Sequence, residues 1–251
     1  MPTIAEIYRY PVKGLTPEPL AEATVAPGGT IPYDRAYAIE NGPSGFDGAA
    51  PAYFPKIAFL MLMRNERLAE LRSRFDPATT TLTIVKAGTV VAEGRLDMPE
   101  GRRAIEAFFD RFEADELRGP AKILSAPGFS FSDVPRKVVS LINLETTRAI
   151  GREFGADVNP LRFRGNLTVE GLPAWEEFVW LGKEIVAGEV RFRVVKRIQR
   201  CAATNVDPET GRRDLTIPVS LMRAYGHSDC GIYLEVVAGG TLRAGDPVAP
   251  A

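Results

Sequence analysis

The chain is poor in the residues that most often mark metal sites and disulfide scaffolds, with only two Cys and one His among 251 residues. Two cysteines argue against the disulfide framework of a small secreted domain, and they are too few to hold an iron–sulfur cluster through four thiolates. No run approaches the roughly 18 uninterrupted apolar residues of a membrane span, and residues 1–6 lack the regions of a signal peptide. We therefore expect a protein of the reducing cytoplasm, without a membrane segment.

The chain also lacks an excess of charge of either sign, because its formal net charge is −1. This balance gives no indication that nucleic acid or an anionic membrane is a partner. The phosphate-binding motifs of P-loop and Rossmann proteins are absent, as are the GxSxG motif of hydrolases and the HExxH motif of zinc proteases. The 45% of hydrophobic residues are enough for a sizeable core, and the length fits one large or two medium domains.

Most of the remaining pattern is typical of short β-strands. We expect strands over residues 4–10, 33–40, 82–85, 90–92, 163–169, 189–195 and 231–237. Residues 86–89 predict a hairpin turn. Residues 41–55 are rich in Gly, Pro and Ala, which indicates a long loop.

Three helices are expected, over residues 66–75, 102–117 and 144–154. The second carries an apolar stripe at i, i+3, i+4 and i+7, which predicts core packing, formed by Ile105, Phe108, Phe109 and Phe112. Asn143 precedes the third helix and Gly155 follows it, as the preferences for an N-cap and a C′ residue predict. Pro, Gly and Ser accumulate near residues 119–135, so we expect two domains, over 1–119 and 120–251. The predicted fold class is mainly β with a few helices.

Cys201 carries the strongest local signal for chemistry. The thiol follows the stretch 195–200, which contains three cations, and precedes a polar turn with Thr204 and Asn205. Nearby positive charge favours the thiolate, which is the form that attacks electrophiles or binds soft metals. The alternative is a small buried hydrophobic side chain, which is the ordinary role of a free cysteine.

Two further stretches present cations. Residues 161–169 alternate, which predicts one polar strand face formed by Arg162, Arg164, Asn166 and Thr168. That face is either a solvated surface or an anion site, because the guanidinium fork suits phosphate. Lys13 and Gly14 follow a strand-ending proline and give a weaker indication of the same kind.

The single histidine lies in a turn with the second cysteine. Together with Cys201, the side chains of His227 and Cys230 are candidates for a zinc site or a Cys–His catalytic site. The sequence contains neither a paired CxxC spacing nor an evident fourth ligand, and both absences argue against this alternative. A turn before the strand over 231–237 is the simpler interpretation.

These fragments, in this order and spacing, resemble the MOSC family, which is related to the C-terminal domain of molybdenum cofactor sulfurase. The likeness is strongest to bacterial relatives of the amidoxime-reducing component, and it covers the whole chain. Its markers are residues 10–14, 33–35, 163–166, 200–201, 204–211 and 240–248. The resemblance implies an N-terminal MOSC-type β-barrel domain followed by a C-terminal MOSC β-barrel domain.

The resemblance also implies a molybdenum cofactor of the molybdopterin type between the two domains, with Cys201 as both the catalytic residue and the metal ligand. The implied cofactor contacts are Lys13, Gly14, Arg35, Asn143, Arg164, Asn166, Gln199, Arg200, Thr204 and Asn205. Gly14 and Gln199 stand where the amidoxime-reducing relatives often have Ser.

The implied activity is a two-electron reduction of small N-oxygenated compounds such as hydroxylamines and amidoximes. Electrons would come from a separate flavin or iron–sulfur protein. The alternative is a non-catalytic carrier of the cofactor, or of a persulfide on Cys201. Neither nucleic acid nor a membrane is an expected partner.

Overall fold

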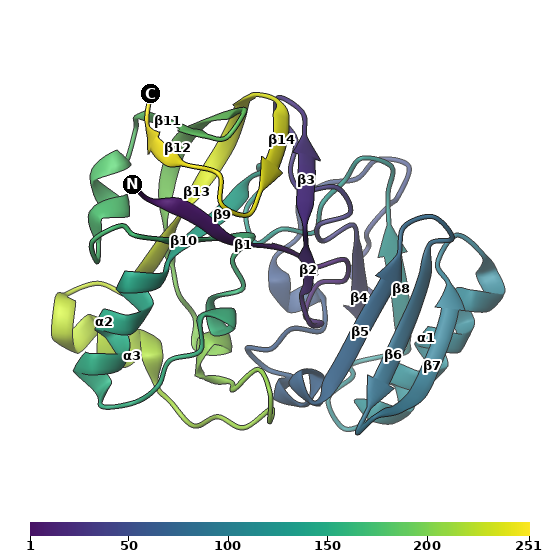
Figure 1. Cartoon of the computed structure of the whole chain (residues 1–251). Coiled ribbons are helices and arrows are strands. Elements are labelled where there is room, and N and C mark those ends of the chain that lie inside the picture. The colour runs from purple at the N-terminus through teal and green to yellow at the C-terminus, as the bar shows by residue number, and fades with distance from the viewer.

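The architecture is mainly β, which confirms the predicted fold class. The computed structural model describes residues 1–251 and contains fifteen β-strands and three α-helices, with short 3₁₀ helices between them. Figure 1 shows two lobes side by side. One lobe holds both termini and the helices α2 (Leu144–Phe154) and α3 (Ile217–Tyr225), and the other holds α1 (Pro99–Phe112).

An eight-stranded sheet forms the lobe that holds the termini. Its strands, in spatial order, are β15 (Val248–Pro250), β11 (Glu184–Ala187), β12 (Val190–Gln199), β13 (Asp229–Ala238), β9 (Val139–Asn143), β10 (Leu167–Glu170), β1 (Thr3–Arg9) and β2 (Glu18–Leu20). β9 and β10 pair in parallel, so a crossover must join them, and α2 lies in that connection. β1 pairs with β10, so the first strand of the chain belongs to a sheet built mostly by the C-terminal half.

The second lobe is built from short antiparallel units. A three-stranded sheet contains β5 (Leu71–Asp76), β6 (Thr81–Lys86) and β7 (Thr89–Arg95), and a separate pair joins β4 (Tyr37–Asn41) to β8 (Ala121–Ser125). The predicted apolar stripe of α1 packs into the core of this lobe, as its helical spacing requires. The remaining pair, β3 (Glu22–Val25) with β14 (Gly240–Arg243), packs against the core of the large sheet.

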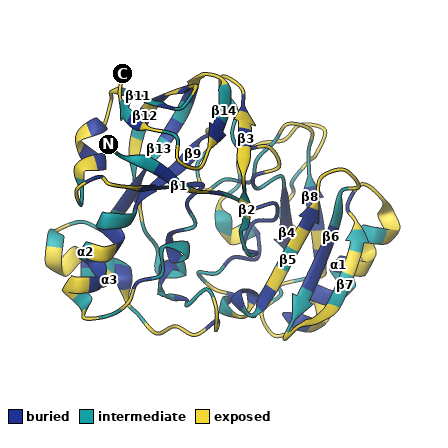
Figure 2. Ribbon diagram, viewed as in Figure 1, coloured by how far each residue is buried: buried dark blue, intermediate teal, exposed yellow.

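In the centre of the large sheet, β9 is buried on both faces, whereas β13 alternates between buried and intermediate residues along much of its length (Figure 2). Leu141 of β9 belongs to the main core of 22 residues, whereas the next residue, Ile142, packs with Ile150 of α2 and Leu221 of α3. Successive side chains of a strand point to opposite faces, so α2 and α3 cover the face opposite to the main core.

The predicted helix over 66–75 is wrong. A 3₁₀ helix spans Glu66–Glu70, and β5 follows at once, paired with β6 along its whole length. Leu71 and Phe75, the buried apolar residues, are four positions apart, which fits both a helical face and one face of a strand. Only the pairing with β6 decides between the two. In contrast, α2 has the predicted bounds, with the Asn143 side chain accepting a hydrogen bond from the Glu145 amide and Gly155 in the left-handed conformation.

A carboxylate is buried without a partner just after α1. Glu113 is 1% exposed, and neither of its carboxylate oxygens accepts a hydrogen bond. Burial raises the pKa of Glu113 from 4.5 to about 7, against the lowering effect of Arg67. The folded protein therefore keeps a proton on this group between about pH 4.5 and 7, where the unfolded chain releases it.

The free energy of unfolding should consequently fall as pH rises through this window, because the unfolded state binds fewer protons. Glu113→Gln is expected to stabilise the protein by about 2–3 kcal/mol more at pH 8 than at pH 5, measured by urea unfolding at both values. Glu170→Gln, at an exposed position of β10 in the other lobe, is the control and should show no such difference. An equal effect of Glu113→Gln at both pH values would contradict the assignment.

Candidate functional site

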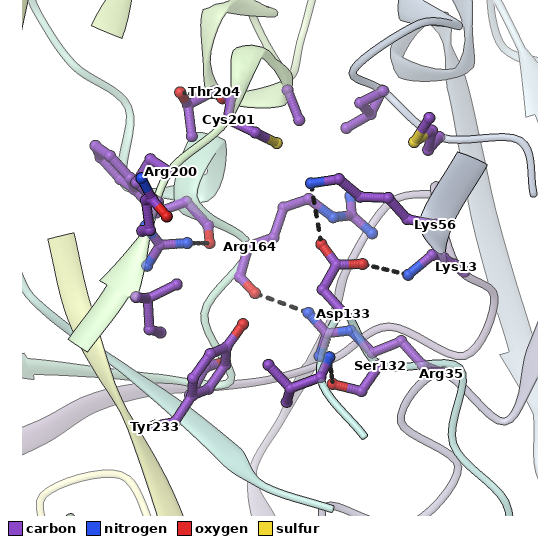
Figure 3. A pocket seen from close by; sticks show the side chains of 18 of the residues that line it. Lys13, Arg35, Lys56, Ser132, Asp133, Arg164, Arg200, Cys201, Thr204 and Tyr233 are labelled. Carbon is purple, nitrogen blue, oxygen red and sulfur yellow. Dashed lines mark hydrogen bonds and ion pairs between the residues drawn. The ribbon is translucent and has the colours of Figure 1, made fainter. Parts of the chain in front are cut away.

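A cavity of about 270 Å³ lies between the two lobes. Its walls come from the segment after β1, from the chain that joins β8 to β9, from the stretch just before β10, and from the end of β12 with the turn that follows it. Figure 3 shows how side chains from these separate segments point toward one another. The cavity therefore exists only because the lobes are packed together.

Eight of the ten predicted cofactor contacts line this cavity together with Cys201. They are Lys13, Gly14, Arg35, Arg164, Asn166, Gln199, Arg200 and Thr204. Their positions run from residue 13 to residue 204, so the fold brings together residues that no local pattern connects.

The other two predicted contacts, Asn143 and Asn205, lie outside the cavity. The Asn143 side chain caps α2 and donates to the Pro173 carbonyl and the Glu177 carboxylate, both at 2.8 Å. The Asn205 side chain accepts a hydrogen bond from the Ile217 amide at 2.9 Å, at the start of α3. Both amides are therefore occupied in holding helix ends.

Cys201 lies where β12 ends and a 3₁₀ helix over Ala202–Asn205 begins. Its carbonyl accepts hydrogen bonds from the Thr204 amide at 3.0 Å and from the Thr204 hydroxyl at 2.9 Å, so the main chain holds this turn. The thiol is partly exposed, and Figure 3 shows it directed into the cavity on the side of Lys56. The sulfur therefore takes no part in holding the turn, and it is accessible to a ligand.

The predicted strand over 163–169 is wrong in its first half, and so is the common face of its arginines. A 3₁₀ helix occupies Pro160–Phe163, Arg164 takes a left-handed conformation with φ 52°, and β10 begins only at Leu167. The alternation is broken as a result. The Arg162 guanidinium is buried in ion pairs with Asp214 at 2.7 Å and Asp207 at 3.0 Å.

Arg164, in contrast, has no acidic partner within ion-pair distance. Burial lowers the pKa of its guanidinium to about 10, and the nearby Arg35 contributes in the same direction. Arg164 is still a cation at neutral pH. An unpaired, partly buried guanidinium at a cavity wall is a favourable binding group for an anion.

Arg35 and Arg200 are held in place by main-chain carbonyls. Arg35 forms an ion pair with Asp34 and donates from Nη2 to the Arg164 carbonyl at 2.9 Å. Arg200 donates to the carbonyls of Cys230 and Phe163, each at 2.7 Å. Both side chains therefore join segments from different parts of the chain around the cavity.

Asp133 is a cavity residue that sequence reasoning missed. Its carboxylate pairs with Lys13 and, at 3.8 Å, with Lys56 (Figure 3). Burial acts to raise its pKa, but the two ammonium groups overcome this effect and lower it to about 2. Asp133 is a lone acid in a Ser- and Pro-rich connection, and Lys56 borders the long loop 41–55, so neither stood in a recognisable pattern.

Lys13 and Lys56 respond differently to this shared carboxylate. Burial lowers the pKa of Lys13 despite the ion pair with Asp133. For Lys56, Asp133 and then the Cys201 thiol outweigh burial and raise the pKa. Lys56 therefore keeps its proton beside the Cys201 sulfur.

The alternative site of Cys201, His227 and Cys230 receives no support from the geometry. Cys230 is completely buried, and neither His227 nor Cys230 lines the cavity. The His227 ring packs against the rings of Trp175 and Phe178, with centroids 5.7 Å apart in each case. No three His, Cys, Asp or Glu side chains of the chain gather closely enough to hold a metal ion.

The chain is similar to known proteins along nearly its whole length. Residues 1–117 match the MOSC N-terminal beta barrel domain, and residues 128–249 match the MOSC domain. None of its helices combines the length and apolar character needed to cross a membrane.

Curated relatives match over shorter segments. Human mitochondrial amidoxime reducing component 2 is 37% identical over 98 residues, which are 34% of this chain and 29% of the human protein. Mouse mitochondrial amidoxime-reducing component 1 is 31% identical over 132 residues, which are 47% of this chain and 37% of the mouse protein. Molybdenum cofactor sulfurase of Caenorhabditis briggsae is 34% identical over 100 residues, which are 38% of this chain and 14% of that protein. The matches thus span well under half of these relatives.

Among solved structures, the YUAD protein of Bacillus subtilis covers 99% of this chain and 94% of its own, with 13% identity and a TM-score of 0.45. This likeness is too weak to support an argument about function. The two domain matches, taken together with the mainly β fold, carry the assignment. The chain belongs to the MOSC family, with the family's N-terminal beta barrel domain preceding the MOSC domain.

Proposed function

We propose that the cavity binds a molybdenum cofactor of the molybdopterin type, and that the protein uses it to reduce small N-oxygenated compounds. The observation that carries this proposal is the pairing of a partly exposed thiol, Cys201, with a strongly cationic wall. Eight Lys and Arg residues line the cavity, against two Asp. A soft sulfur ligand beside an excess of cations suits a group that combines a metal with a phosphate.

The residues present fit such a group in a second respect. Arg164 is an unpaired cation at the wall, so an incoming phosphate does not have to displace a carboxylate from it. Lys13 and Arg35, on the opposite lobe, add further donors. We propose that these three side chains hold the phosphate, and that Cys201 binds the metal.

When bound, the cofactor supplies the two-electron chemistry that separates oxygen from nitrogen. Reduction of a hydroxylamine consumes two electrons and two protons and releases an amine and water. We propose a separate flavin or iron–sulfur protein as the electron donor. The name shared by several relatives, amidoxime reducing component, is consistent with this reaction class.

The chain's own residues supply positioning and protons. Burial raises the pKa of Tyr233, whose hydroxyl points into the cavity in Figure 3. Tyr233 Oη and Lys56 Nζ both keep their protons at neutral pH, and both are therefore candidate donors to the substrate. Asp133 has a pKa of about 2 and stays ionised, so its role is to orient Lys13 and Lys56.

Elemental and pterin analysis of freshly purified protein is the decisive measurement. We expect about one molybdenum and one pterin per chain from a host that makes the cofactor. We also expect turnover of an amidoxime and a hydroxylamine with a reduced dye as electron donor. Protein from a host that lacks cofactor synthesis is the control. Molybdenum without turnover would indicate a carrier, and zinc or no metal would overturn the proposal.

A further inference from the structure

Tyr10, the first residue after β1, lies under two cavity arginines. Its side chain is completely buried, and its ring centroid lies 4.4 Å from the Arg35 guanidinium carbon and 4.4 Å from that of Arg164. Tyr10 itself does not line the cavity, whereas both arginines do. One aromatic ring thus supports two cations that face the same space.

Two guanidinium groups so close together repel each other, and only Arg35 has a carboxylate partner, Asp34. The face of an aromatic ring attracts a cation through its quadrupole, and this attraction grows when water is excluded. Burial raises the pKa of Tyr10 to about 12, so the ring is neutral at neutral pH. The ring therefore offsets part of the repulsion for Arg164, which has no other partner.

The backbone around Tyr10 also restrains Arg35. Arg35 and Arg164 both have left-handed backbone conformations, with φ 50° and 52°, which are unfavourable for residues with a side chain. The Tyr10 carbonyl accepts a hydrogen bond from the Arg35 amide at 2.7 Å, and the Tyr10 amide donates to Asp34 at 2.9 Å. Tyr10 is therefore the residue against which both the turn and the guanidinium of Arg35 are held.

We infer that Tyr10 is a positioning residue of the anion site, and that its aromatic ring holds Arg35 and Arg164 in the orientation that binds phosphate. The hydroxyl has no part in this role, because it has no hydrogen-bond partner. The inference rests on the proposed function in one respect, which is that these arginines bind an anion.

The test measures the affinity of the full chain, produced without the cofactor, for inorganic phosphate at constant ionic strength. Tyr10→Leu is expected to weaken phosphate binding about tenfold, because both cation–π contacts are lost. Tyr10→Phe keeps the ring and should bind within about twofold of the unsubstituted protein. If Tyr10→Leu does not fold, Tyr10→Met, whose flexible side chain adapts to irregular space, takes its place.

The matched control is Phe112→Leu. The Phe112 ring also lies beneath two cations, Arg67 at 4.6 Å and Lys86 at 4.9 Å, but none of these three residues lines the cavity. This variant should lose stability without losing phosphate affinity, which separates positioning from a general effect on folding.

Three results would overturn the inference: unchanged phosphate binding in the Leu variant, an equal loss in the Phe variant, or no phosphate binding by the unsubstituted protein. Its failure is distinguishable from that of the proposed function. A Tyr10-dependent phosphate site in a protein that never acquires molybdenum would support the inference and count against the proposed function alone.

Discussion

Replacement of Cys201 by Ser is expected to lower the affinity for molybdenum at least about tenfold and to leave the fold intact. A serine oxygen is a harder ligand than sulfur, and it keeps its proton at neutral pH, so the metal bond weakens. The fold should persist because the Cys201 carbonyl, and not the thiol, accepts the hydrogen bonds from Thr204 that hold the turn. Molybdenum content after extensive dialysis and the melting temperature are the two measurements.

Cys230→Ala is the control for this experiment. The Cys230 thiol is completely buried, and burial raises its pKa to about 12, so it is a neutral packing group. This variant should keep its molybdenum even if its melting temperature falls. Full molybdenum content and normal turnover in Cys201→Ser would refute the ligand assignment, and loss of metal only in Cys230→Ala would favour the Cys–His alternative.

Arg164→Ala is expected to reduce cofactor retention about tenfold to a hundredfold. A charge-assisted contact of this kind contributes about 1.5–3 kcal/mol. Folding should be little affected, because Arg164 has no carboxylate partner that would be left unpaired. Alanine also carries the same left-handed backbone penalty as arginine at φ 52°.

Pterin and molybdenum retained after dialysis measure the effect of Arg164→Ala. Arg164→Lys keeps the charge without the two-pronged donor geometry, and it should retain an intermediate amount of cofactor. Arg193→Ala removes an exposed arginine that pairs with Glu184 at 2.9 Å, and it should have no effect. Equal retention in Arg164→Ala and Arg193→Ala would mean that the cavity cations are only a solvated surface.

Local signals in the sequence were sufficient for several elements. Helix α2 has its predicted bounds because its capping residue, Asn143, and its terminating residue, Gly155, act within a few positions of the helix ends. The stripe of α1 is buried as predicted, because its periodicity already matches a helical face. The order and spacing of the family markers placed eight of the implied contacts at one cavity.

Tertiary structure alone decided the remainder. β5 is a strand because β6 pairs with it, although its apolar spacing also fits a helix. Arg162 and Arg164 are equivalent in an alternating pattern, and both line the cavity. The fold brings Asp207 and Asp214 to Arg162 as ion-pair partners, whereas Arg164 has none.

The same holds for the polar groups around the site. Asp133 forms an ion pair with Lys13, which lies 120 residues earlier in the sequence. The side-chain amides of Asn143 and Asn205 instead form hydrogen bonds at helix ends, outside the cavity. Caps and periodicity depend on neighbours within a turn or two of the chain, so a sequence displays them directly. Ion pairs and strand pairing depend on which segments the fold brings together. For this reason the sequence alone identified Cys201 and the cations near it as candidate site residues, whereas only the structure showed which residues they contact.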